Sequence, residues 1–81
     1  MEFPQVFPIK VMGANQDDFE AMVLAIIQKH APIVTEEVVS RRLSRGDRFL
    51  SVTVHIMAES QEQLDAIYAE LSSHERVLMM L

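Results

Sequence analysis

The stretch from Ser40 to Ile56, SRRLSRGDRFLSVTVHI, decides the fold of this chain. It opens with a short charged strand, breaks at a turn around Gly46 and continues into a second strand. From Phe49 to Met57 apolar and polar residues alternate, which is the period of a strand with one buried face. The stretch therefore predicts a β-hairpin whose second strand turns four side chains to a core: Leu50, Val52, Val54 and Ile56.

Two segments outside the hairpin predict helices. Apolar residues recur at helical spacing from Phe19 to Ile27 and again from Leu64 to Leu71. Asn15 is the expected N-cap of the first helix, and Pro32 is expected to stop it. Ser60 and Gln63 form a capping-box pair ahead of the second helix.

Three further segments predict strands. Because Pro8 has no amide donor, the first strand is expected at Ile9–Met12, with residues 1–8 as an extended N-terminal arm. Residues 33–43 predict a charged edge strand, and Glu75–Leu81 a last short strand. With right-handed crossovers, this order predicts an α+β, ferredoxin-like βαββαβ two-layer sandwich over residues 9–81. Its four-stranded antiparallel sheet has the order 4-1-3-2, with two helices on one face.

Composition restricts the function. An 81-residue chain is one domain, and its formal net charge of −5 disfavours nucleic-acid and membrane-surface partners. The absence of Cys excludes disulfides and thiol catalysis. The N-terminus has no signal-peptide pattern, and no apolar run approaches the roughly 20 residues that cross a bilayer. We therefore expect a cytoplasmic protein with no membrane partner.

Catalytic and metal-binding sets are missing from the sequence. The three His are far apart, and none has the paired spacing of a metal site. His55 shares the predicted outer strand face with Ser51, but no acid in the sequence pattern orients it. Two Gly cannot build a phosphate-binding loop. We expect no enzymatic activity, no metal and no cofactor.

Several short motifs together resemble the YbeD-like family, small bacterial proteins of unknown function. The motifs are FP near the start, KVMG (Lys10–Gly13), HAP (His30–Pro32), the S-x-G turn (Ser44–Gly46), SVT (Ser51–Thr53), the Tyr68–Leu71 helix end and V-x-M-x-L (Val77–Leu81). Pro8 departs from the pattern, since a residue that donates to the sheet is expected there. The resemblance covers nearly the whole chain. It implies a ferredoxin-like fold similar to ACT domains, which sense amino acids in metabolic enzymes, and no established activity.

The resemblance to ACT domains also implies a ligand site. In those domains the ligand lies near the turn after the first strand, often at a dimer interface. The matching turn here consists of Gly13, Ala14, Asn15 and Gln16. Free amides at the start of the helix would suit a carboxylate. The alternative is that Gly13 only turns the chain and Asn15 only caps the helix.

The hairpin carries a cluster of four arginines: Arg41, Arg42, Arg45 and Arg48. As a functional patch they would bind an anion, RNA or a protein partner through charge-assisted hydrogen bonds. The alternative is a solvated hairpin in which Glu36 and Glu37 neutralise some of the charge. RNA binding on an open sheet needs stacking aromatics, and only Phe49 qualifies, so nucleic acid is disfavoured.

The outer face of the sheet is the remaining candidate. If the hairpin's apolar residues face the helices, then Met12, Phe49, His55 and Met57 face outward, together with Leu78 and Met80. This is more apolar surface than a monomer usually exposes in one place. The alternative is that these residues are scattered singly or covered by the arm.

Two functions follow as hypotheses. The favoured one is a non-catalytic regulatory or adaptor module that acts through a protein partner. The alternative is an ACT-like sensor of an amino acid or another anion. We also expect a monomer at micromolar concentration with a weak homodimer above it, because the methionine surface lacks the aromatic anchors of tight interfaces.

Overall fold

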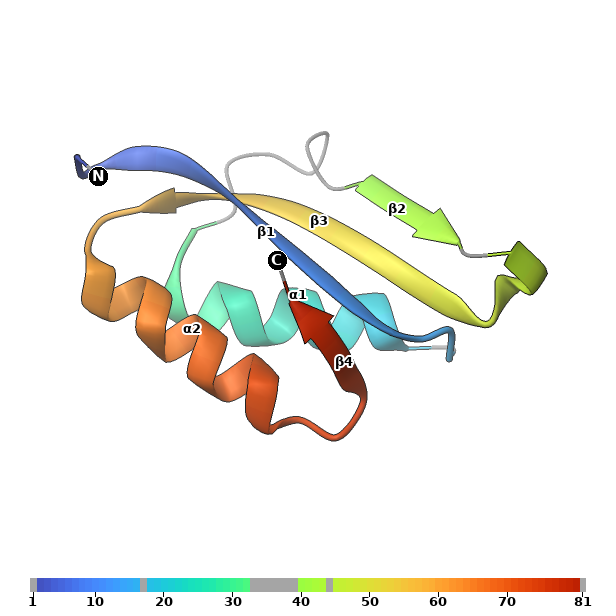
Figure 1. The fold of residues 1–81 in the computed structure, drawn as a ribbon. Helices are drawn as coiled ribbons and strands as arrows, with labels where there is room; N and C mark the ends of the chain where they lie inside the picture. The colour runs from blue at the N-terminus through green and yellow to red at the C-terminus, as the bar shows by residue number, and fades with distance from the viewer. Residues whose placement is uncertain (1, 17, 33–39, 44, 81) are drawn as a thin grey trace.

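Two helices cover one face of a four-stranded antiparallel sheet (Figure 1). The computed structural model describes residues 2–16, 18–32, 40–43 and 45–80. In chain order the elements are β1 (Gln5–Ala14), α1 (Phe19–His30), β2 (Ser40–Leu43), the 3-10 turn η2 (Arg45–Asp47), β3 (Phe49–Ala58), α2 (Gln61–Ser73) and β4 (Val77–Met80). The expected α+β ferredoxin-like class with two helices is confirmed. The strands follow the order β2-β3-β1-β4, and all neighbours run antiparallel.

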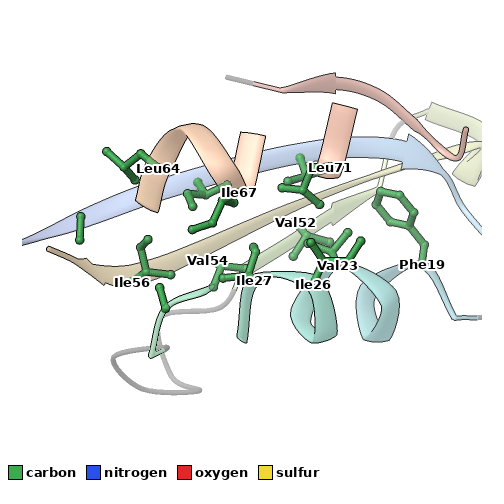
Figure 2. Close-up of a cluster of buried hydrophobic side chains, with 14 of the residues drawn as sticks. Phe19, Val23, Ile26, Ile27, Val52, Val54, Ile56, Leu64, Ile67 and Leu71 are labelled. Carbon is green, nitrogen blue, oxygen red and sulfur yellow. The ribbon is translucent and has the colours of Figure 1, made fainter. Parts of the chain in front are cut away.

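The core lies between the helices and the inner face of β3. Strand β3 alternates as its sequence predicts, with Leu50, Val52, Val54 and Ile56 buried. Apolar residues of both helices close over them, among them Phe19, Val23 and Ile27 from α1 and Leu64, Ile67 and Leu71 from α2 (Figure 2). No polar or charged residue of the described part of the chain is buried in this core. Hydrophobic burial therefore holds the two layers together.

The two helices begin in different ways. The Ser60 hydroxyl accepts a hydrogen bond from the Gln63 amide at 3.1 Å, so the predicted cap of α2 is confirmed. The prediction for α1 is wrong: its N-cap is Asp18, not Asn15, and the Asp18 side chain makes no capping hydrogen bond. Asn15 instead forms hydrogen bonds with the β2–β3 hairpin turn, and α1 begins at Phe19.

Strand β1 corrects the expected arm and the role of Pro8. The strand begins at Gln5 instead of Ile9, and its pairing with β3 runs through Pro8, which lies opposite His55. In the described part of the chain, β4 pairs only with Val11–Gly13 of β1. Among the described residues, the other side of β1 from Gln5 to Lys10 therefore has no strand partner, and a proline nitrogen facing that side costs no ladder bond.

Strand β4 corrects the predicted faces of its methionines. Its register with β1 shifts between Met12 and Gly13, so that Met79 lies opposite Met12 and Met80 opposite Val11. Such a bulge reverses the alternation expected from the sequence. Met80 accordingly packs against the core, and Met79 takes the outward position that was predicted for Met80. Leu78 is exposed and lies in the bulge, between the residues that pair with Gly13 and Met12.

The β2–β3 connection is a tight turn with two successive left-handed residues. Gly46 has a φ of 79° and Asp47 a φ of 55°. Gly adopts this conformation without penalty, and Asp is among the few other residues that tolerate it. Strand β2 spans the last four residues of the predicted edge strand, and residues 33–39 lie outside the described residues. No helix in the described part of the chain is long and apolar enough to cross a membrane.

Candidate functional site: the open face of the sheet

The face of the sheet opposite the helices, here called the open face, is built from alternating residues of β1 and β3. Register places four cross-strand pairs on it, and these pairs are Val6–Met57, Pro8–His55, Lys10–Thr53 and Met12–Ser51. A fifth pair, Ala14–Phe49, lies at the end of the sheet near the hairpin turn. All four predicted residues, Met12, Phe49, His55 and Met57, therefore share this face.

The middle of the open face is hollowed. Lys10, Met12, Ser51 and Met79 line a depression of about 230 Å³. Met79 is 50% exposed and Phe49 is 40% exposed, whereas Met12, His55 and Met57 are half-buried. Flexible methionines around a shallow hollow can re-pack to fit an apolar group of a partner. The Lys10 ammonium at its side adds one fixed charge.

The turn after β1 is tied to the hairpin turn. The Asn15 amide donates to the Arg48 carbonyl oxygen at 2.9 Å, and its side-chain Nδ2 donates to the Asp47 carbonyl oxygen at 2.9 Å. The Gln16 amide donates to the Ala14 carbonyl oxygen. Two amides of the predicted ligand turn are therefore already used within the protein. The structure thus joins the predicted ligand turn to the end of the predicted Arg cluster.

Gly13 is required at this turn by close packing. A Cβ at position 13 would lie closer than 3.0 Å to the Phe19 ring and to the Arg76 carbonyl oxygen. Its backbone is not left-handed, since the positive-φ residues of the described chain are Gly46 and Asp47. The absence of a side chain at Gly13 is what lets the first turn of α1 and the start of β4 approach β1.

Sequence reasoning missed Arg76, which lies directly behind this turn. Its Nη1 pairs with the Asp18 carboxylate at 2.6 Å, and its guanidinium lies 5.9 Å from the centre of the Phe19 ring. The Nε and Nη2 atoms are buried and have no hydrogen-bond partner among the described residues. The Arg76 hydrogen bond and charge lower the pKa of Asp18. The available signal was the position of Arg76, a charged residue directly before the apolar segment Val77–Met80.

The Arg cluster is only partly described. Arg41 and Arg42 lie in β2 opposite Val52 and Ser51, and Arg45 opens the turn. The side chains of these three residues lie outside what the structure describes. Arg48 is exposed, and its carbonyl oxygen accepts the Asn15 amide.

A second polar cluster joins the two helices at the far end of the molecule. Glu70 of α2 pairs with Lys29 and, at 2.8 Å, with His30 Nε2 of α1. Hydrogen bonds from Lys29 and then His30 lower the pKa of the Glu70 carboxyl. Gln63 Nε2 donates to the His30 carbonyl oxygen at 2.9 Å. The Gln63 hydrogen bond gives a partner to a backbone carbonyl oxygen at the end of α1, and the ion pairs of Glu70 connect the two helices. The cluster therefore has a structural role. Among the described residues, no group of three His, Asp or Glu is placed to hold a metal ion.

Residues 1–81 match the model of a protein family described as a protein of unknown function, DUF493. The chain belongs to this family. Its relatives include a UPF0250 protein of Chromobacterium violaceum, 42% identical over 80 residues that cover 99% of this chain and 90% of that one. A UPF0250 protein of Neisseria gonorrhoeae is 43% identical over 81 residues, covering 100% of this chain and 89% of the relative. The resemblance to the YbeD-like family is thereby confirmed.

Solved structures share the fold at low sequence identity. Protein HP0495 from H. pylori superposes with a TM-score of 0.79 at 14% identity, covering 100% of this chain and 85% of that one. The ACT domain from GTP pyrophosphokinase of Chlorobium tepidum gives a TM-score of 0.76 at 14% identity, covering 96% of both chains. The likeness to these two structures shows that the DUF493 chain has an ACT-like fold.

Proposed function

We propose that this DUF493 protein is a non-catalytic regulatory or adaptor module that acts in the cytoplasm through a protein partner on its open face. The observation that carries the proposal is the hollow between Met12 and Met79, in a sheet face that no other element of the described chain covers. An apolar hollow on an uncovered face is typical of a site at which another molecule binds.

The chemistry of the open face supports binding over catalysis. Its polar groups are Lys10, Ser51, Thr53 and His55, which alternate with methionine and other apolar side chains. Lys10 and Ser51 line the hollow without a carboxylate beside them. A nucleophile with a base and an orienting acid is therefore not assembled in the hollow. The mixture of adaptable apolar groups and isolated polar groups suits a protein surface.

Site-specific photo-crosslinking tests this proposal. A photoreactive amino acid at Met79 reports contacts at the hollow, and the same residue at Glu62, which is exposed on α2, is the matched control. We expect a discrete protein adduct in cells from position 79 and not from position 62. Met79→Glu should abolish the binding of the purified partner, since it replaces an apolar contact of the hollow with a carboxylate that loses hydration when the partner covers it. Identical adducts from both positions would contradict the proposal.

A second candidate function is recognition of a small anion at the Gly13–Gln16 turn, and Arg76 is the observation that favours it. Two nitrogens of its guanidinium are buried without a hydrogen-bond partner among the described residues, and its backbone carbonyl oxygen lies against Gly13. The Asp18 carboxylate, however, already sits on Nη1, and the Asn15 and Gln16 amides are used within the chain. An anion would have to displace these contacts.

A thermal-shift screen with amino acids and metabolite anions separates the two functions. A bound ligand stabilises the fold by RT ln(1 + [L]/Kd), about 2.7 kcal/mol at a hundredfold excess over Kd. A shift for one amino acid that disappears in Asn15→Ala would favour the sensor. No shift across the screen, with an adduct at position 79, would favour the adaptor.

A further inference from the structure

Charge is divided between the two layers of the molecule. Among the residues that the structure describes, no Asp or Glu falls within the bounds of the four strands. The strands instead contain three cations, Lys10, Arg41 and Arg42, together with His55. The chain as a whole carries a net charge of −5, so the strands of its described part differ in sign from the chain.

The helix layer shows the opposite composition. Helix α2 contains Glu62, Asp65 and Glu70 and no Lys, Arg or His. Helix α1 contains one carboxylate, Glu20, and its two basic residues, Lys29 and His30, both pair with Glu70. The cations on the helix side are therefore neutralised locally, and the layer stays acidic.

Lys10 is the positively charged residue at the centre of the open face. It lies opposite Thr53, it lines the hollow beside Met12 and Met79, and it is exposed. No ion pair is recorded for it with any residue that the structure describes. Like charges from a basic partner would be repelled here, whereas a carboxylate could reach the ammonium group while apolar side chains fill the hollow.

We propose that the open face binds an acidic amphipathic helix of a partner protein, with Lys10 as the residue that selects for negative charge. This inference rests on the proposed adaptor function, whose site it shares. A helix fits this face because its spaced apolar side chains form one ridge, which can fill a shallow hollow such as the one that Met12 and Met79 line, and helices commonly cover sheet faces. Spaced apolar residues of such a helix would meet Met12, Met79 and Met57.

Two synthetic helical peptides test the charge preference directly. They share one stripe of leucine and methionine at helical spacing, and their polar positions hold Glu and Gln in one peptide and Lys and Gln in the other. Binding is followed by NMR shift changes of the amides of Lys10, Ser51 and Met79 in the full chain. A single-stranded oligouridylate serves as a third probe.

Lys10→Gln removes the charge at the hollow, and Lys29→Gln removes the same charge from the helix layer as the matched control. We expect the acidic peptide to bind the open face more tightly than the basic one, with about fivefold of that preference lost in Lys10→Gln, as for one exposed ion pair. The preference should persist in Lys29→Gln and reverse in Lys10→Glu.

Each other outcome decides against the acidic partner alone or against both proposals. Equal affinities of the two peptides at the open face, or a tighter basic peptide, would overturn the acidic partner and leave the adaptor function standing. Tighter binding of the oligouridylate than of the acidic peptide would also overturn it. Shift changes confined to the helices, or none with any probe, would overturn both proposals.

Discussion

At the scale of single residues, Gly13 sets how closely three segments pack. We predict that Gly13→Ala destabilises the protein by about 1–3 kcal/mol, because the added methyl group overlaps the Phe19 ring and the backbone of Arg76. Urea denaturation followed by circular dichroism measures the change.

Gly46 supplies the matched control for Gly13. A Cβ at Gly46 meets no atom within 4 Å, but the residue has a positive φ. Gly46→Ala should therefore cost only the left-handed backbone penalty of about 1–2 kcal/mol, and Gly46→Asn should recover part of it. A Gly13→Ala variant as stable as the wild type would show that the turn relaxes freely.

The Asp18–Arg76 pair predicts a contribution to acid stability. The pKa of Asp18 is lowered in the folded state from its ordinary value of 3.8. Its stabilisation is therefore present above that ordinary value and is lost as the pH falls through the lower folded value. We expect Asp18→Asn to flatten the loss of stability at the acid end, in denaturation curves taken between neutral pH and about pH 2.

Glu62→Gln is the control for this titration, since it removes a carboxylate of α2 with no recorded ion pair among the described residues. In Glu62→Gln, the free energy of unfolding should fall more steeply at low pH than it does in Asp18→Asn. Direct NMR titration of the Asp18 carboxyl should give a pKa below 3.8. A value at or above it would mean that Arg76 does not hold this carboxylate in solution.

At the scale of elements, Gln63 connects the end of one helix with the start of the other. Its Oε1 accepts the Glu59 amide at 2.7 Å, and its Nε2 donates to the His30 carbonyl oxygen. We predict that Gln63→Ala loses about 1–2 kcal/mol of stability, as two hydrogen bonds of ordinary strength would contribute. Gln63→Glu keeps the acceptor and removes the donor, so about half of the loss should remain. If both variants were as stable as the wild type, the two side-chain hydrogen bonds of Gln63 would not contribute to stability.

Elements with a complete local pattern were predictable from the sequence. Strand β3 alternates without a break, and α2 has both its cap and its apolar stripe, so their positions followed from local rules. The start of β1 could not be predicted in this way. Pro8 is tolerated only where a strand has an unpartnered side, and whether β1 has such a side depends on the length of β4. The faces of β4 depend on a bulge, which no residue in Val77–Met80 announces.

The residues of the candidate site also differ in how far local sequence predicts them. Met12, Phe49, His55 and Met57 could be assigned to one face because they follow from strand alternation. Asn15 was predicted as a helix cap because its local sequence suits one, but its hydrogen bonds go to Asp47 and Arg48 across the sheet. Such contacts between segments distant in sequence leave no local signal.

At the scale of the whole molecule, the open face governs self-association. Two copies that met through this face would bring two Lys10 side chains together around methionines. We expect a monomer at micromolar concentration and a weak dimer at higher concentration, strengthened by salt because salt screens like charges. Sedimentation equilibrium at low and high ionic strength measures it. A stable dimer that Met57→Glu does not weaken would place the contact on another surface.

Pro8 has a consequence for how the protein behaves in a crowded solution. The segment Val6–Met12, VFPIKVM, holds the β-branched and aromatic residues of an amyloid-forming stretch. Its outer side up to Lys10 has no strand partner among the residues that the structure describes. Proline and lysine at an edge are gatekeepers that hinder stacking of one copy on another. Pro8→Val should fold normally and yet form thioflavin-positive fibrils on agitation, under conditions in which the wild type stays clear. An unchanged lag time would locate the protection elsewhere. We therefore expect the missing N–H at this position to hinder the addition of a strand from another copy along this edge.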